Sequence, residues 1–171
     1  MRAWRELTLI VVALSAGPFP VHAQRSEALL RATLLDLDSV KVVIQGLTTD
    51  AGAAGISERT LRTKVELALR QAGIRVVKDS QRDYFFLDVA IMDVKVGERI
   101  VGYAYNVHYS LSRSTYILDG SLPSAALFAV VWNSDQLAMT SMTGVSSTIY
   151  ETVQDQLEEF LNDYLTANPR Q

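Results

Sequence analysis

The residues that could carry chemistry in this chain are few, and they centre on one histidine. His22 lies among the first 23 residues, which have the pattern of a cleaved leader, so His108 is the single imidazole of the remainder. The chain has no cysteine, which removes thiolate nucleophiles, disulfides and most zinc sites. The sequence also lacks a G-x-S-x-G elbow and an Asp-rich calcium loop. We therefore expect neither a metal nor a cofactor.

A glycine pair just before a helix is the one feature that could hold an anion. Gly52 and Gly55 precede a helix start at Ser57, and helix N-termini attract phosphate groups. The lysine and the remaining glycine of a phosphate-binding loop are missing, and no G-x-G-x-x-G occurs. We interpret residues 48–55 as an exposed loop and not as a phosphate site.

His108 acquires a neighbour when the middle of the chain is paired as a hairpin. A register with Val96 opposite Ile100 keeps the apolar faces of both strands together, because a slip by one residue would invert one strand. That register places Asp88 directly opposite His108. We interpret the two as an exposed cross-strand pair, because no nucleophile or oxyanion donor lies nearby in the pattern. A hydrolase that uses His108 and Asp88 is the remaining enzymatic alternative.

The same register gathers aromatic and polar side chains on one face of the hairpin. Ala90 falls opposite Asn106, and Phe86 falls opposite Ser110. An apolar patch with a polar surround indicates a partner site or a dimer surface, unless residues 24–35 cover it. The candidate partner surface consists of Tyr84, Phe86, Asp88, Met92, Asn106, His108 and Ser110.

The elements that must position this surface are predicted by hydrophobic periodicity. Alternation of apolar residues predicts strands, with turns at Gly97-Glu98, at 118–124 and at Asn133-Ser134-Asp135. The tyrosines of the second hairpin strand are expected to face the core. The expected strands cover residues 37–46, 74–77, 84–96, 100–112, 127–132 and, as a last short piece, 137–142.

Two amphipathic helices complete the pattern. The first begins at Ser57, carries the staple residues Ile56 and Leu61, and ends at Gly73. The second is expected over residues 148–166, with a Thr148–Glu151 capping box. The sequence thus predicts an α+β two-layer sandwich in which two helices pack on one face of a four- to five-stranded mixed sheet, in β-α-β-β-β-β-α order.

The N-terminal residues have the three parts of an export signal. Arg2 and Arg5 precede an apolar run of about ten residues, which is too short to span a bilayer. Residues 21–23 provide a small-residue cleavage site. We therefore expect a signal peptide over 1–23, a flexible or weakly helical lead-in over 24–36 and one domain over 37–167. The protein would be periplasmic or secreted, with no transmembrane span in the mature chain.

Charge excludes some partners. The chain has 16 basic and 19 acidic residues, without a Lys/Arg cluster, so nucleic acid is not an expected partner. The lack of a cysteine at the cleavage site also leaves no residue for lipidation.

The order of elements and two phrases carry a family resemblance. LRTKVELALRQAGIRVV at 61–77 and LEEFLNDYLTANP at 157–169 resemble a group of small exported bacterial proteins. More distantly, the layout is similar to the amino-terminal domain of TolB and to the CsgG and LptE groups of envelope domains. The resemblance implies an envelope role in binding or assembly, although the chain departs from LptE lipoproteins by lacking the lipidation cysteine.

Together these features predict a non-enzymatic periplasmic module that binds another envelope component, or itself, through the sheet face. The alternative is a small protein that holds an apolar ligand between the sheet and the helices.

Overall fold

The computed structural model describes residues 32–47, 49–79, 82–116 and 126–169. The predicted signal peptide, most of the lead-in and the turn at 118–124 lie outside these residues. Along the chain the elements are β1 (Ser39–Gln45), α2 (Thr49–Ala53), α3 (Glu58–Gln71), β2 (Arg75–Val76), β3 (Asp83–Val96), β4 (Arg99–Tyr116), β5 (Ala126–Ser141) and α4 (Val145–Ala167).

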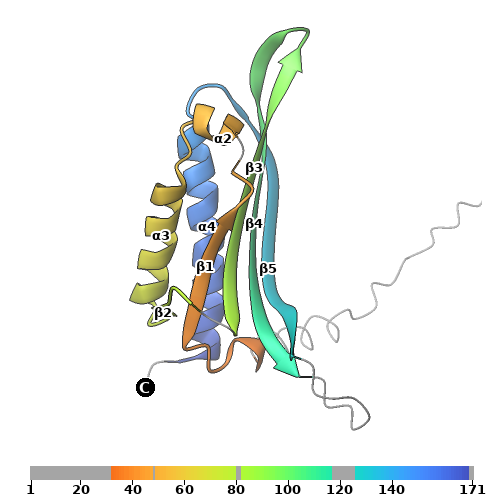
Figure 1. Ribbon diagram of the computed structural model, residues 1–171. Coiled ribbons are helices and arrows are strands. Elements are labelled where there is room, and N and C mark those ends of the chain that lie inside the picture. Colours follow the sequence, from red (N-terminus) through yellow and green to blue (C-terminus); the bar gives the residue numbers. More distant parts are fainter. Residues whose placement is uncertain (1–31, 48, 80–81, 117–125, 170–171) are drawn as a thin grey trace, which may run out of the picture.

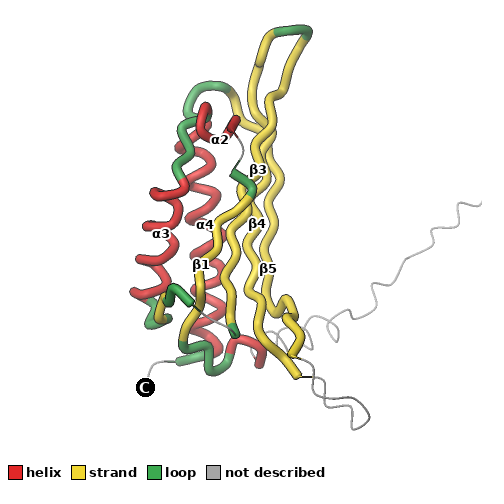
Figure 2. Tube along the Cα trace, viewed as in Figure 1, coloured by secondary structure: helices red, strands yellow, loops and turns green. Residues whose placement is uncertain are grey.

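The strands form one mixed sheet in the order β2-β1-β3-β4-β5. β1 runs parallel to both β2 and β3, whereas β3, β4 and β5 are joined as antiparallel neighbours. Helices α3 and α4 pack against the same face of the sheet (Figure 1 and Figure 2). The predicted α+β fold with two helices on one face of a mixed sheet is confirmed.

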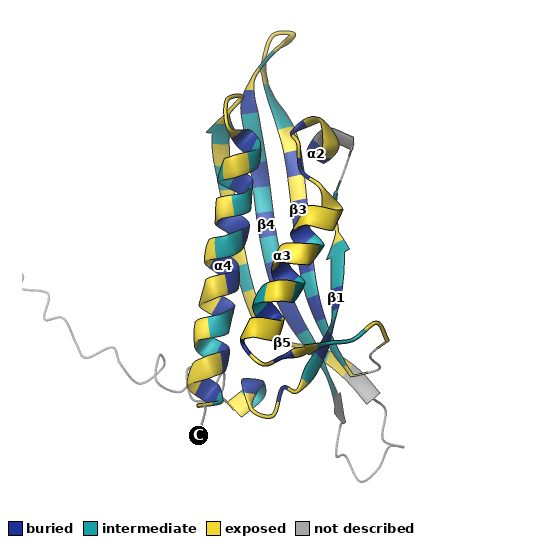
Figure 3. Ribbon diagram, turned by 90° about the vertical axis from the view of Figure 1, so that its left-hand side faces the viewer, coloured by how far each residue is buried: buried dark blue, intermediate teal, exposed yellow. Residues whose placement is uncertain are grey.

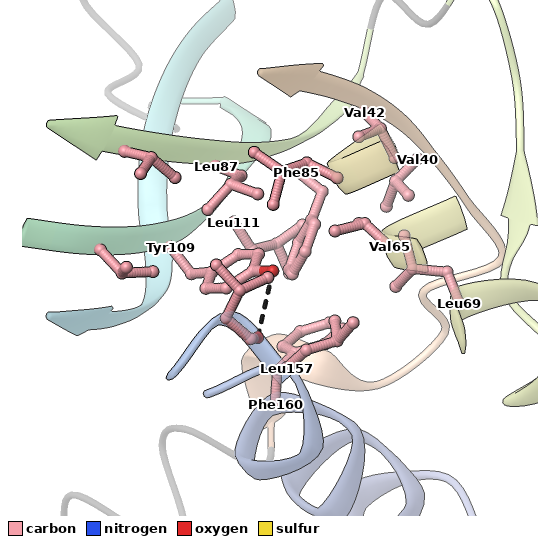
Figure 4. Packing of buried hydrophobic residues seen from close by; sticks show 14 of the residues in the cluster. Val40, Val42, Val65, Leu69, Phe85, Leu87, Tyr109, Leu111, Leu157 and Phe160 are labelled. Atoms are coloured by element: carbon pink, nitrogen blue, oxygen red, sulfur yellow. Dashed lines mark hydrogen bonds between the residues drawn. The ribbon is translucent and has the colours of Figure 1, made fainter. Parts of the chain in front are cut away.

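The core lies between the helices and the sheet, and it is built from alternate strand residues. Phe85, Leu87 and Val89 of β3 are fully buried, as are Leu61 and Leu69 of α3. Figure 3 shows the buried stripe of each helix turned toward the sheet, and Figure 4 shows side chains from both layers meeting around Phe160. The period of two in the strands and of 3.6 in the helices supplies one apolar face to each layer.

Tyr103, Tyr105 and Tyr109 of β4 face the core, as predicted, and the hydroxyl groups of Tyr105 and Tyr109 bond to α4. The Tyr105 hydroxyl lies 3.0 Å from the Thr152 hydroxyl, and the Tyr109 hydroxyl donates to the Val153 carbonyl at 3.4 Å. Burial raises the pKa of Tyr109 above its ordinary range. These bonds satisfy polar atoms in an apolar layer, and they help to fix the position of α4 along β4.

The hairpin register is partly as predicted. Asp88 is opposite His108, Ala90 opposite Asn106 and Phe86 opposite Ser110, as the alternation requires. The prediction at the turn is wrong, because Val96 pairs with Arg99. The register shifts by one residue between Val94 and Lys95, where Val101 of β4 is the extra residue. This bulge allows a two-residue loop at Gly97-Glu98, where Gly97 has a φ of 62°.

The last part of the sheet differs from the prediction. The expected turn at Asn133-Ser134-Asp135 is absent, and 127–132 and 137–142 belong to one continuous strand, β5. Pairing with β4 outweighs the local turn signal, because each of these three residues has a partner in the β4 ladder. A register shift between Leu111 and Ser112 leaves Val131 as the extra residue on β5.

Two helix boundaries are corrected, whereas those of α3 are as predicted apart from its side-chain cap. The predicted loop 48–55 contains the short helix α2, which places Ala51 in the core. α4 begins at Val145, three residues before the predicted start, after Gly144 with a φ of 76°. Thr148 therefore lies within the helix and forms no capping box. At α3 the Ser57 backbone is extended, yet its side chain makes no capping hydrogen bond, while Gly73 ends the helix region with a φ of 96°.

Candidate functional site

One face of the sheet is not covered by α2, α3 or α4, and we call it the open face. All seven residues of the predicted partner surface lie on it, because β3 and β4 alternate between the core and this face. Figure 1 shows the helices on the opposite side of the sheet. Of the lead-in, residues 32–36 are described, and Leu34 among them is buried in the core and not placed on the open face.

One end of the open face carries an aromatic cluster, which we define as Tyr84, Phe86 and Phe128. The rings of Tyr84 and Phe86 are stacked, with centroids 5.9 Å apart. Phe128 meets Tyr84 edge-on at 5.4 Å, although the two residues belong to strands on either side of β4. Small serines on β4 make this approach possible, because Ser112 is opposite Tyr84 and Ser114 is opposite Phe128. More than half of the Phe128 side-chain surface is exposed, which gives the cluster an open side.

The sequence reasoning missed Phe128, and the reason is its register. A strand over 127–132 was expected, but no partner strand was assigned to it. The signal that could have found it is the spacing of Phe128 and Val130, two residues apart across Ala129, which places two large apolar residues on one face. Both are exposed in the structure, at 55% and 61%.

Three polar residues in one cross-strand row, Asp88, His108 and Asp135, cross the middle of the open face, and we call this row the polar rung. His108 lies opposite Asp88 on β3 and opposite Asp135 on β5, so one imidazole stands between two carboxylate-bearing positions. The Asp88 carboxylate packs against Gly46, which places it on the β1 side of β3. The structure brings Asp88 and His108 to adjacent positions, and among the described residues no hydrogen bond or ion pair links them.

Gly46 is needed where it is, and this can be tested. A Cβ atom at Gly46 would collide with the Asp88 carboxylate and lie 3.3 Å from the Val89 nitrogen, and the residue has a φ of +78°. We expect Gly46→Ala to lower the free energy of unfolding by about 1–3 kcal/mol, because left-handed backbone strain adds to the steric conflict. Urea denaturation measures the change.

The matched control for Gly46→Ala is Gly52→Ala. Gly52 lies in α2, and a Cβ atom there would have open space around it. We expect this change to be neutral or slightly stabilising, because alanine favours helix. Equal losses from both substitutions would contradict the role assigned to Gly46.

The other end of the open face is apolar and faces solvent. Met92, Leu137 and Met139 are 66%, 79% and 70% exposed. A shallow pocket of about 220 Å³ lies here, lined by Ala90, Ile91, Met92, Ala104, Tyr105, Asn106 and Leu137. The side-chain oxygen of Asn106 is buried and has no hydrogen-bond partner. Several large apolar side chains exposed next to one another are typical of a surface that binds another molecule.

Two more hollows lie away from the open face. One of about 570 Å³ is polar and includes Arg75, Arg113 and Asp38 in its lining. The other, of about 490 Å³, lies between β1 and α3 and includes Val42 and Arg62. One arginine in each hollow is bound by the fold: Arg113 pairs with Asp83, and Arg62 donates to the Val42 carbonyl at 3.1 Å.

Within the part of the chain that the structure describes, no group of three or more histidine, aspartate or glutamate side chains is placed to hold a metal ion. No described helix combines the length and the hydropathy needed to cross a membrane, α4 included.

Comparison with known proteins gives a distant likeness in fold. No protein-family model matches the chain, and no curated protein matches its sequence. Three solved structures are similar to it at a distance. A minor lipoprotein from Acinetobacter baumannii has 9% identity and a TM-score of 0.37, over 78% of this chain and 95% of that one. The rare lipoprotein B from Shewanella oneidensis has 11% identity and a TM-score of 0.28, over 76% and 92% of the two chains. The PelC dodecamer from Paraburkholderia phytofirmans has 16% identity and a TM-score of 0.34, over 77% and 85%.

These matches make the chain distantly similar to bacterial lipoproteins in the arrangement of its elements. At such identities and scores the likeness says nothing about a site or a partner.

Proposed function

We propose that this protein is a non-enzymatic binding module of the bacterial envelope that holds another envelope protein against its open face. The observation that carries the proposal is the sheet face that no described helix covers, with an aromatic cluster at one end, exposed methionines and Leu137 at the other, and a polar rung between them. Interfaces use buried aromatic and methionine anchors for affinity and polar groups for orientation.

The layout of the face specifies the partner chemically. Tyr84 and Met92 are eight residues apart on β3, which corresponds to about 27 Å at the usual rise per strand residue. A partner must therefore offer two apolar contacts at this separation. Between them Asp88 and Asp135 offer carboxylates, so a lysine or arginine of the partner would complement the rung.

Two other functions receive less support. An apolar ligand between sheet and helices would have to enter a layer filled by Phe85, Leu157 and Phe160, each with no exposed surface. A hydrolase would need His108 to be bonded to its base partner or nucleophile. Asp88 packs against Gly46, and among the described residues no hydrogen bond or ion pair joins His108 to Asp88 or to Ser110.

The test is capture of the partner by the tagged full-length chain after crosslinking in its native host. We expect Phe86→Glu and Phe128→Glu each to reduce capture at least tenfold, because a carboxylate would then be buried in an apolar contact. Phe128→Glu is the safer variant for folding, since Phe128 is more than half exposed.

The control is Leu67→Glu, which makes the same kind of change on α3. Leu67 is 52% exposed and lies on the helical layer. The Leu67→Glu variant should capture the same protein as the wild-type chain. If all three variants capture the same proteins equally, or if the wild-type chain captures none, the open face is not a partner site.

A further inference from the structure

β5 leaves one whole side of its backbone at the edge of the sheet. It is the last strand in the order β2-β1-β3-β4-β5, it is 16 residues long, and among the described strands it pairs only with β4. Within the described residues, the hydrogen bonds that reach β5 from α4 and from Thr33 lie near its middle. Thr33 donates to the Val131 carbonyl, and α4 binds the Trp132 and Ser134 side chains.

The C-terminal part of this edge lacks the usual protection against pairing. Natural edge strands carry lysine, proline, a bulge or an inward charge that prevents another strand from adding. The segment from Gln136 to Ser141 (QLAMTS) contains no charge and no proline, and its register with β4 is regular. Leu137 and Met139 in this segment are also among the most exposed large apolar residues of the described chain.

We propose that this edge pairs with a second copy of the chain, antiparallel and across a two-fold axis, so that two five-stranded sheets become one. The occupant is a second copy because the segment complements itself. In an antiparallel pair of identical strands, each contact occurs twice, and residues directly opposite must share a face.

Only a few registers satisfy that condition, and one of them fits the side chains best. With Ala138 on the two-fold axis, Leu137 lies opposite the partner's Met139, and Asp135 lies opposite the partner's Ser141. Apolar side chains then meet apolar side chains, and the carboxylate meets a hydroxyl group.

Two other registers fit less well. With Asp135 on the axis, two carboxylates would face each other directly, which is unfavourable. With Leu137 on the axis, Asp135 would lie opposite the partner's Met139. With Ala138 on the axis, the two copies also meet on the helix-covered face through Ala138, whose side chain is small.

This inference uses the backbone edge of β5, whereas the partner proposal uses the open face. Leu137 and Met139 belong to both surfaces, and Phe86→Glu separates the two proposals because it changes the open face outside the edge segment. The dimer would join two open faces into one continuous surface. The end of each face that carries Met92 and Met139 would lie at the centre of this surface.

The absence of cysteine allows a direct test of the register. Gln136→Cys and Thr140→Cys are made singly in the full-length chain. In the proposed register, position 136 lies opposite the partner's position 140, and each position is about 13 Å from its own copy. A disulfide needs Cα atoms closer than about 7 Å. We therefore expect little crosslinking from either variant alone, and efficient crosslinking only when the two are mixed.

Sedimentation equilibrium provides the second measurement. The wild-type chain should be dimeric at micromolar concentration, and Leu137→Lys should weaken association at least tenfold with an unchanged Tm. Met92→Lys, on the same face but in β3, should remain dimeric, as should Phe86→Glu. A monomeric wild-type chain, or a Gln136→Cys variant that crosslinks to itself as well as to Thr140→Cys, would overturn the proposal.

Discussion

Replacement of Phe160 by alanine is expected to lower the free energy of unfolding by about 3–5 kcal/mol. Phe160 has no exposed surface, and it joins the two layers of the fold. Its ring centroid lies 4.6 Å from that of Phe85 in β3 and 5.0 Å from that of Trp132 in β5. The substitution would leave a cavity between α4 and the sheet, and it would remove both aromatic contacts. Urea denaturation followed by circular dichroism measures the loss.

The size of the effect depends on burial and not on helix propensity. Leu165→Ala in the same helix is the control, because Leu165 is 37% exposed and the change keeps a good helix former. We expect it to cost less than about 1 kcal/mol, in the range of ordinary surface changes. A loss for Phe160→Ala as small as that of the control would mean that the contacts of Phe160 with Phe85 and Trp132 are not the centre of the core.

Replacement of Arg113 by methionine is expected to lower the free energy of unfolding by about 2–3 kcal/mol and to loosen the start of the domain. The Arg113 Nε lies 3.2 Å from the Asp83 carboxylate, so the pair ties β4 to β3. The same guanidinium donates from Nη1 to the carbonyls of Thr33 and Leu35, at 2.8 and 2.9 Å. Both partners of the pair are mostly buried, so loss of the arginine removes charge-assisted bonds from groups with little access to water.

Hydrogen exchange distinguishes this effect from a general loss of stability. Amides around residues 34–37 should exchange faster in Arg113→Met than the global change accounts for, because Leu34 and Leu37 are held in the core beside these bonds. Arg59→Met, at an exposed position on α3, should leave both measurements nearly unchanged. In the double variant with Asp83→Asn, the losses should not add, because the two residues share one interaction. Strict additivity would show that Arg113 and Asp83 act independently.

The comparison of sequence and structure is clearest along β3 and β4. Alternation assigned Phe85, Leu87 and Tyr109 to the core, and it placed Asp88 opposite His108, all of which the structure confirms. This works because a strand has a side-chain period of two, so a single apolar face limits the register to even shifts. The predicted pairing at the tip of the same hairpin is wrong. A bulge at Val101 shifts the register there, and it leaves the pattern of faces in the body of the strands unchanged.

The helices show the same division. Leu61, Val65 and Leu69 identify the buried stripe of α3 from the sequence alone, because helical spacing places them on one side. The start of α4 was not predictable in the same way. Gly144 adopts a left-handed conformation that lets the chain turn from β5 into the helix, and the capping pattern at Thr148 was a local coincidence.

The amino-acid sequence by itself determined the fold class, the two helices, the core faces of the strands and the Asp88–His108 pairing, because each depends on local periodicity. The tertiary structure alone decided that β5 runs unbroken through Asn133-Ser134-Asp135, that Asp135 completes the polar rung, and that Phe128 meets Tyr84 across β4. These features depend on pairing between residues far apart in the chain and on a bulge at Val131. Hydrogen bonding to β4 overrides the turn propensity of the segment, and no local pattern records that competition.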